Sequence, residues 1–251
     1  MEKNNEDKLA FKKRSNVIYF EVGAYYLIIA FALAMVLFLT AVPFQLWHLP
    51  VYLLPVFIIG WCQFSLSNAL HEGLHKNFGK EHSEFWTALL TAYPIGFSMN
   101  YRHTHLEHHK YFGDKDKDPD YTGYCNFPKS KKEFIFRLLY NISGIAAIKQ
   151  FFKENTSGNA SADDEKKDSY VLLKLTCVQL VIMSLFFIAF LHVHVLAGLF
   201  AYGLFWILPL VTVAKFCSST RLLCEHGTPK KAIGLQNHHR QFFSDKFIRC
   251  F

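Results

Sequence analysis

Apolar residues gather in four long blocks along the chain, separated by polar stretches. The blocks cover residues 22–42, 49–66, 175–191 and 197–214, and none of them contains Asp, Glu, Lys or Arg. At about 1.5 Å per residue, a helix of about 20 residues crosses the hydrocarbon core of a bilayer. The pattern therefore predicts an all-α integral membrane protein with four transmembrane helices.

The lengths of the polar stretches predict how these helices connect. With flanking residues included, the predicted spans are 18–42, 49–69, 170–192 and 196–215. The connections after the first and third spans are short, so the four helices form two hairpins of antiparallel neighbours. A long loop, residues 71–169, separates the hairpins. We expect one domain over residues 1–251.

Two stretches of the long loop are apolar in part but too short to cross a membrane. Residues 85–98 fall short of the roughly 20 residues that a span needs, so they are predicted to be re-entrant, interfacial or a cap over the polar region. Residues 133–152 mix apolar and basic positions. This amphipathic pattern is typical of a helix on the membrane surface.

The positive charges predict the orientation of the spans. All 27 Lys and Arg residues lie within residues 1–16, 71–174 and 215–251, and the turns at 43–48 and 192–196 contain none. By the positive-inside rule, both termini and the long loop are cytoplasmic. The formal net charge of +7 belongs to this arrangement. A basic nucleic-acid-binding protein would not segregate its charge around four spans, so that class is excluded.

Composition excludes further classes of protein. Hydrophobic residues make up 51% of the chain and 26 residues are Phe, which excludes a disordered or collagen-like chain. The six Cys residues form no CxxC motif, and several lie in the apolar blocks. This usage indicates reduced thiols and argues against both a disulfide framework and a zinc ribbon.

Histidines cluster at two places on the predicted cytoplasmic side. His71 and His75 come just after the second apolar block, at a spacing of four residues. His105, His108 and His109 lie further along the loop, at spacings of three and four residues. Residues at these spacings share one face of a helix. Five imidazoles arranged in this way predict a metal site.

Ligand type alone leaves the metal open, because imidazole suits zinc, copper, iron and nickel. The segment HEGLH at 71–75 also satisfies the HExxH pattern of zinc proteases, with Glu72 as general base. One catalytic zinc needs only three protein ligands, so five imidazoles favour two metal ions. Non-haem iron suits a site beside a bilayer, because cleaving an unactivated C–H bond of a lipid requires an oxidant that side chains lack.

The histidine motifs resemble those of a known family. HEGLH at 71–75, HLEHH at 105–109, the acidic segment YFGDKDKDPDY at 111–121 and RLLCEHG at 221–227 are similar to motifs of the membrane fatty acid desaturase superfamily. This superfamily also includes hydroxylases and ketolases of lipids and carotenoids. The order of hairpin, long cytoplasmic loop and second hairpin is similar too, and the resemblance covers nearly the whole chain.

The resemblance implies a function and a set of metal ligands. It implies an O2-dependent oxidoreductase with two iron ions, which introduces a double bond into a fatty acyl chain. Electrons would come from a separate donor protein of the ferredoxin or cytochrome b5 type. The implied iron ligands are His71, His75, His105, His108 and His109, with His226 as an additional one. Asp116, Asp118 and Asp120 either brace the helix that carries the second motif or form a solvated acidic loop.

The family places a third histidine motif, HxxHH or QxxHH, after the last span. The nearest candidate here is LQNHHRQFF, in which Leu235 stands three residues before His238. We expect that the third motif lies beyond residue 251 and that this chain is a truncated product. Alternatively, His238 and His239 substitute for it. Three other functions stay open: a lipid or carotenoid hydroxylase or ketolase, a membrane zinc metalloprotease, and an inactive remnant.

Overall fold

The computed structural model describes residues 2–40, 45–76, 78, 83–97, 101–121, 130–149, 162–191, 193 and 196–226. Every regular element within these ranges is a helix, which confirms the prediction of an all-α protein. The chain divides into two compact units. Unit 1 consists of residues 1–99 and 159–210, and unit 2 consists of residues 100–158 and 211–251.

Four helices are long and apolar enough to cross a membrane, as predicted. They cover Asn16–Thr40, Leu49–Leu74, Tyr170–Phe190 and Ala197–Leu222. The second and fourth helices continue beyond the predicted ends at residues 69 and 215. A helix is held by its backbone hydrogen bonds, so it can continue past the end of the apolar block that predicts a span.

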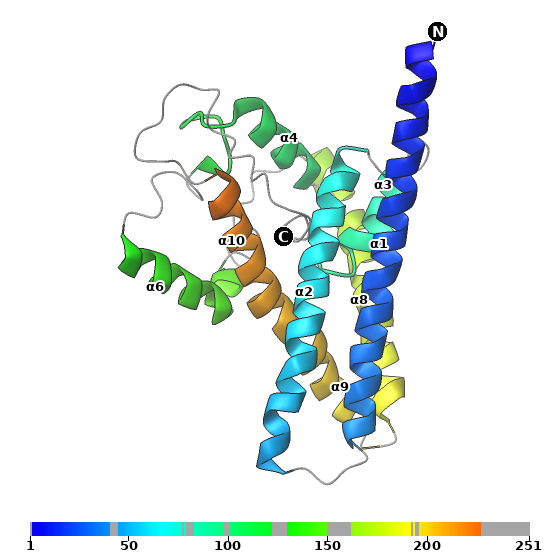
Figure 1. Cartoon of the computed structure of the whole chain (residues 1–251), viewed down its shortest axis with the longest axis vertical. Coiled ribbons are helices and arrows are strands. Elements are labelled where there is room, and N and C mark those ends of the chain that lie inside the picture. The colour runs from blue at the N-terminus through cyan, green and yellow to red at the C-terminus, as the bar shows by residue number, and fades with distance from the viewer. Residues whose placement is uncertain are drawn as a thin grey trace. The chain divides into compact units, whose positions relative to one another are not determined.

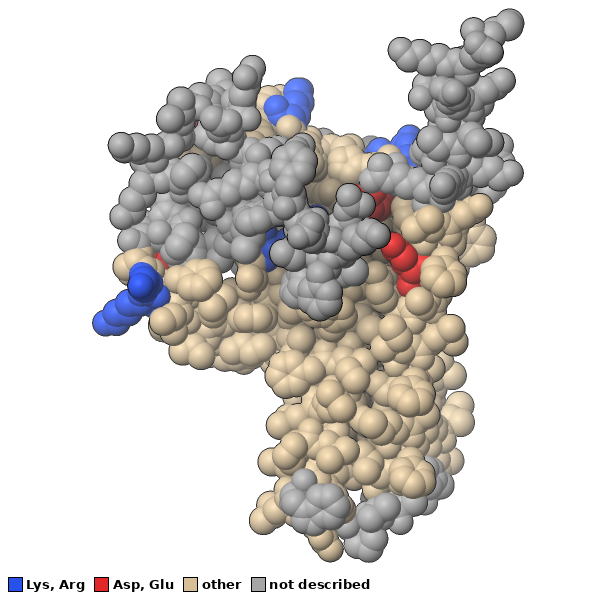
Figure 2. Space-filling view, in the orientation of Figure 1, with Lys and Arg blue, Asp and Glu red and all other residues tan. Residues whose placement is uncertain are grey.

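The predicted hairpins are present in unit 1. Helix α1 (Glu2–Thr40) packs along α2 (Leu49–Leu74), and the short helical turn η1 (Leu46–His48) precedes α2 in the chain. Helix α8 (Ala162–Phe190) packs along α9 (Ala197–Tyr202) (Figure 1). Large apolar side chains such as Phe31 remain exposed on these helices, as expected for lipid-facing positions. The face drawn in Figure 2 shows a long surface without charged side chains on the hairpins of unit 1.

The fourth span is irregular around Pro209. Two π-helical turns, η3 (Gly203–Ile207) and η4 (Leu210–Ala214), flank this proline. Proline lacks a backbone N–H, so the regular hydrogen-bond ladder is interrupted there. The buried Gln63 side chain of α2 donates to the carbonyl oxygen of Trp206 at 2.9 Å. This bond ties α2 to the irregular turn.

The short apolar segment of the loop is built into unit 1. It forms α3 (Ser83–Thr87) and the π-helical turn η2 (Ala88–Ala92), and both pack against α2. The Tyr26 hydroxyl donates to the Leu90 carbonyl at 2.7 Å, and the Gln179 amide donates to the Tyr93 and Pro94 carbonyls at 2.6 and 2.9 Å. These donors satisfy backbone oxygens at the end of a helix that lies among apolar elements.

Unit 2 contains the other described helices. These are α4 (Tyr101–Tyr111), α6 (Lys131–Ile142) and α10 (Lys215–His226), and α6 packs against α10. Helix α6 begins after Ser130, whose hydroxyl accepts a hydrogen bond from the Glu133 backbone N–H. Within the predicted amphipathic stretch at 133–152, residues 133–142 are thus helical, and residues 145–149 are helical as well.

Gly198 allows the close approach of α8 and α9, because a Cβ atom at this position would overlap the backbone of Phe187. We expect the Gly198→Ala variant to lose about 1–3 kcal/mol of stability through overpacking. Gly203→Ala, in the same span, is the matched control, since no atom lies within 4 Å of its added Cβ. Thermal unfolding of the detergent-solubilised variants measures the difference. Equal midpoints would contradict this explanation of Gly198.

Candidate metal centre

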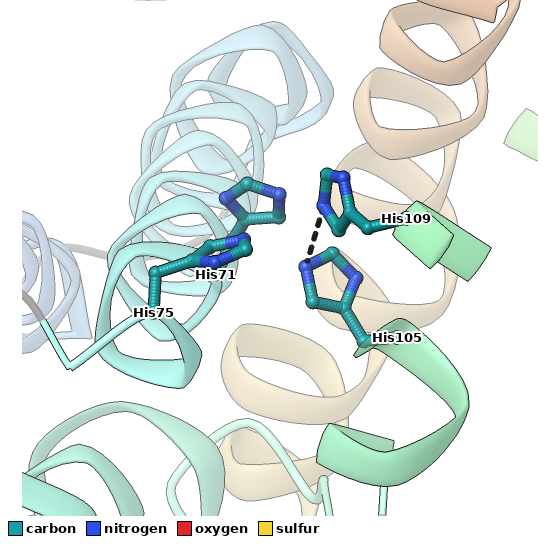
Figure 3. A group of neighbouring side chains, drawn as sticks. All are labelled: His71, His75, His105 and His109. Carbon is teal, nitrogen blue, oxygen red and sulfur yellow. Dashed lines mark hydrogen bonds between the residues drawn. The ribbon is translucent and has the colours of Figure 1, made fainter. Parts of the chain in front are cut away.

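The first histidine pair lies at the end of α2. His71 is in the last turn of the helix, His75 is its C-cap, and the centroids of their rings are 5.0 Å apart. Candidate ligand atoms of the two rings lie within 4.8 Å of each other, and both rings project from the same side of α2 (Figure 3). The four-residue spacing therefore brings the two rings together on one face of the helix, as the sequence predicts.

Gly73 lies between these two histidines, where the chain has no room for a side chain. A Cβ atom here would overlap the side chain of Thr87, which belongs to α3, and would lie 2.9 Å from Phe78 Cδ2. Leu70 and Leu74 are also buried beside the pair. The first pair therefore projects from a helix end that is tightly packed by apolar neighbours.

The second histidine pair lies on α4. His105 is buried and His109 is exposed, and their Nε2 atoms are 3.1 Å apart (Figure 3). A neutral imidazole nitrogen without a proton is an acceptor, so two such atoms cannot approach this closely unless a proton or a cation lies between them. Two nitrogens bound to one metal at about 2.1 Å are about 3.0–3.4 Å apart. The separation fits a hydrogen bond between the two rings, and it equally suits a shared metal ion that replaces the proton.

His108, the remaining histidine of the HLEHH motif, contacts an acidic partner. Its Nδ1 atom lies 2.8 Å from Asp118 Oδ1, and both side chains are buried. The ring N–H at Nδ1 donates to the carboxylate, which leaves Nε2 as the nitrogen with the lone pair. A carboxylate that fixes the tautomer in this way is the common partner of a metal-binding histidine.

The backbone of the acidic segment holds Asp118 in place. Asp118 Oδ2 accepts from the Gly113 backbone N–H at 3.1 Å, and Oδ1 accepts from the Asp120 backbone N–H at 2.9 Å. Gly113 has a φ of +82°, which lets the chain turn back toward α4. Asp118 therefore braces α4, the helix that carries the second histidine motif, whereas Asp116 is exposed. Of the two alternatives left by the sequence, bracing applies to Asp118.

Asp120 adds a second carboxyl group beside His108. Its Oδ2 atom lies 3.8 Å from His108 Nδ1. Burial raises the pKa of the Asp120 carboxyl above its ordinary value, and the nearby Asp118 charge raises it further. His108 and Lys215 act in the opposite direction on this pKa. Asp118, with the shorter contact to the ring, is the main partner of His108.

Four of the predicted ligands thus form two close pairs, His71 with His75 in unit 1 and His105 with His109 in unit 2, and each pair offers nitrogen atoms that could hold a metal ion (Figure 3). His108 is held by Asp118 as described above. His226 is the last residue of α10, and its side chain lies outside the described part of the chain, as do His238 and His239. The complete ligand set remains a prediction.

An apolar cavity of about 450 Å³ also lies in unit 1, lined in part by Thr40, Tyr52, Phe190 and Ala201. Tyr52 and His71 are both on α2, and their separation along the helix corresponds to about 28 Å. The Thr40 and Tyr52 hydroxyls donate to the carbonyls of Leu37 and Leu39. The cavity is thus too far from the first histidine pair to belong to the candidate metal centre.

Comparisons with known proteins place the chain in a family. The fatty acid desaturase family matches residues 47–247. Dihydrorhizobitoxine desaturase from Bradyrhizobium elkanii is 27% identical to the chain over 197 residues, which is 70% of the chain and 52% of the relative. The chain therefore spans about half the length of this curated relative. No solved structure matches.

Proposed function

Because the chain belongs to the fatty acid desaturase family, a family of di-iron oxidoreductases, we propose that it introduces a double bond into the acyl chain of a membrane lipid with O2 as oxidant. The observation that carries this proposal is the pair of Nε2 atoms of His105 and His109, only 3.1 Å apart. Together with the His71 and His75 pair, this arrangement supplies nitrogen donors of the type that iron accepts.

The proposed iron ligands are the six histidines that the family motifs identify. They are His71, His75, His105, His108, His109 and His226. In this proposal the α2 pair and the α4 group contribute to one di-iron centre. Nε2 is the ligand atom of His108, because its Nδ1 atom is engaged by Asp118. Any further ligands would come from a third histidine motif, for which His238 and His239 are the candidates in this sequence.

The bound irons would supply the redox chemistry that activates O2, which protein side chains cannot supply. The protein holds the ligands and limits access of water. Leu70 and Leu74 are buried in the apolar core on the same helix end as the first pair, so the packing there excludes water. Asp118 keeps the His108 ring in one tautomer and one orientation. The apolar hairpins offer a lipid-compatible path for the acyl chain.

The reaction requires a separate reductant. The acyl chain gives up two hydrogen atoms and gains a double bond, while O2 is reduced to two water molecules. The balance needs two further electrons and two protons, which we assign to a ferredoxin or cytochrome b5 type donor and to solvent. We place the histidines and both termini on the cytoplasmic side, because the positive charges lie at that end of the spans. A basic surface there would attract an acidic donor protein.

Metal analysis of the full-length, detergent-purified protein tests the proposed function. We expect about two irons per chain and no stoichiometric zinc. One zinc per chain, with proteolysis that Glu72→Gln abolishes, would favour the HExxH protease instead. Absence of metal after reconstitution with ferrous iron would indicate an inactive remnant. Product analysis by mass spectrometry separates a desaturase, which removes two hydrogens, from a hydroxylase, which adds one oxygen.

A further inference from the structure

Helix α6 presents an apolar face that no described part of unit 2 covers. Ile135, Phe136 and Leu139 are 56%, 67% and 61% exposed. They lie on one side of the helix, since residues three and four positions apart share a face. Three large apolar side chains that are exposed together indicate a contact surface rather than scattered surface residues.

Unit 2 itself places this helix beside a membrane span. Helix α6 packs on α10, and the chain turns at Gly144, which has a φ of +80°. A Cβ atom on Gly144 would lie 3.4 Å from Val211 Cγ2 and 3.6 Å from the Val211 carbonyl oxygen. Val211 belongs to the span Ala197–Leu222 and precedes its first charged residue, Lys215, by about 6 Å along the helix. The end of α6 is therefore level with the edge of the apolar part of the span.

The polar groups of α6 suit the headgroup layer of a bilayer. Lys131 and Lys132 are exposed at its first turn, and Glu133 is its only acidic residue. Near its end, the Phe136 and Tyr140 rings stack at 6.3 Å, and Lys149 Nζ lies 5.7 Å from the centre of the Tyr140 ring. Aromatic rings with neighbouring lysines are typical of helices that lie at a membrane interface.

We propose that α6 lies flat in the membrane interface, with Ile135, Phe136 and Leu139 among the lipid acyl chains and with Lys131 and Lys132 on anionic headgroups. The partner of this surface is thus the lipid bilayer. Burial of these apolar side chains among lipid acyl chains is favourable, because it removes their surface from water. The two lysines add a preference for anionic lipid, at about 1 kcal/mol, or about fivefold, for each.

Photo-crosslinking with lipids tests this proposal on the unaltered full-length protein. The protein is reconstituted in phosphatidylcholine vesicles, with and without phosphatidylglycerol, that contain lipids with a diazirine on the acyl chain. We expect labelling of the 131–142 peptide and also of α1, whose exposed Phe31 and Phe38 serve as an internal positive control. Labelling of α1 without labelling of α6 would overturn the proposal.

The charge contribution is tested with a matched pair of variants. We expect K131Q/K132Q to reduce labelling of α6 by an anionic diazirine lipid at least fivefold, while K115Q/K117Q, which removes two exposed lysines from the acidic segment, leaves it unchanged. An equal loss in both variants would show that the lysines of α6 contribute no specific contact with anionic lipid. Neither measurement depends on bound metal, so the result is independent of the proposed enzymatic function.

Discussion

Replacing His105 with glutamine is expected to abolish desaturation and to remove most of the bound iron. His105 is buried, and its Nε2 atom faces that of His109 at 3.1 Å. Glutamine keeps a polar side chain but offers no imidazole nitrogen, and its amide is a weak metal ligand. Loss even of a group that only supports a ligand costs 10–100-fold in metal affinity, so loss of the ligand itself should cost at least about 100-fold. Iron content by mass spectrometry and product formation measure the effect.

The matched control for this variant lies on the same helix. His103 falls outside the HxxHH spacing of the second motif, two residues before His105. His103→Gln should therefore keep its iron and its activity. If both variants lost iron equally, damage to α4 as a whole would explain the result. If His105→Gln kept two irons per chain, the assignment of His105 as a ligand would be wrong.

Asp118→Asn should have the second largest effect, although Asp118 is no proposed ligand. Asparagine has nearly the same shape as aspartate, and its carbonyl oxygen can still accept from the Gly113 or Asp120 backbone N–H. Its NH2 group, however, is a donor and would face His108 Nδ1, which now must act as an acceptor. The proton of the neutral ring then moves to Nε2, the atom proposed to bind iron. We expect iron affinity to fall by about 10–100-fold.

The tautomer of His108 separates this positioning role from a merely structural one. Nitrogen NMR of the metal-free protein with labelled histidine should show a proton on Nδ1 in the unaltered chain and on Nε2 in Asp118→Asn. The signal of His108 is identified by its absence in His108→Gln. Asp116→Asn is the control, because Asp116 is exposed in the same segment. Equal iron affinity and equal spectra for the two Asp→Asn variants would contradict the role of Asp118.

The membrane spans could be predicted from the sequence, because the residues within each span are enough to determine that it forms a helix. A run of about 20 uncharged residues has few ways to satisfy its backbone within a membrane other than a helix. The ends were less predictable, since α2 continues to Leu74 through the polar residues Asn68 and His71. The π-helical turns beside Pro209 were not predicted either. Pro209 accounts for an interruption of the helix, but the bond from the Gln63 amide to the Trp206 carbonyl is a tertiary contact, which no local pattern reveals.

The histidine pairs were predictable for the same reason, because helical geometry alone brings residues four positions apart together. The partner of His108 was not. Four aspartates alternate in the segment 111–121, and hydropathy treats Asp118 and its neighbours Asp116 and Asp120 alike. Asp118 is the aspartate that the turn at Gly113 and the backbone N–H groups of Gly113 and Asp120 hold against His108. A glycine before an acidic segment that follows a histidine motif was the one available signal.

Mössbauer spectroscopy of the full-length protein, reconstituted with isotopically enriched iron, tests the central claim most directly. If the α2 pair and the α4 group bind one di-iron centre, the oxidised protein should show two high-spin ferric ions that are magnetically coupled to each other. The His71→Gln and His105→Gln variants should each lose this coupled signal. Isolated single irons, or a coupled signal that survives both substitutions, would contradict the account.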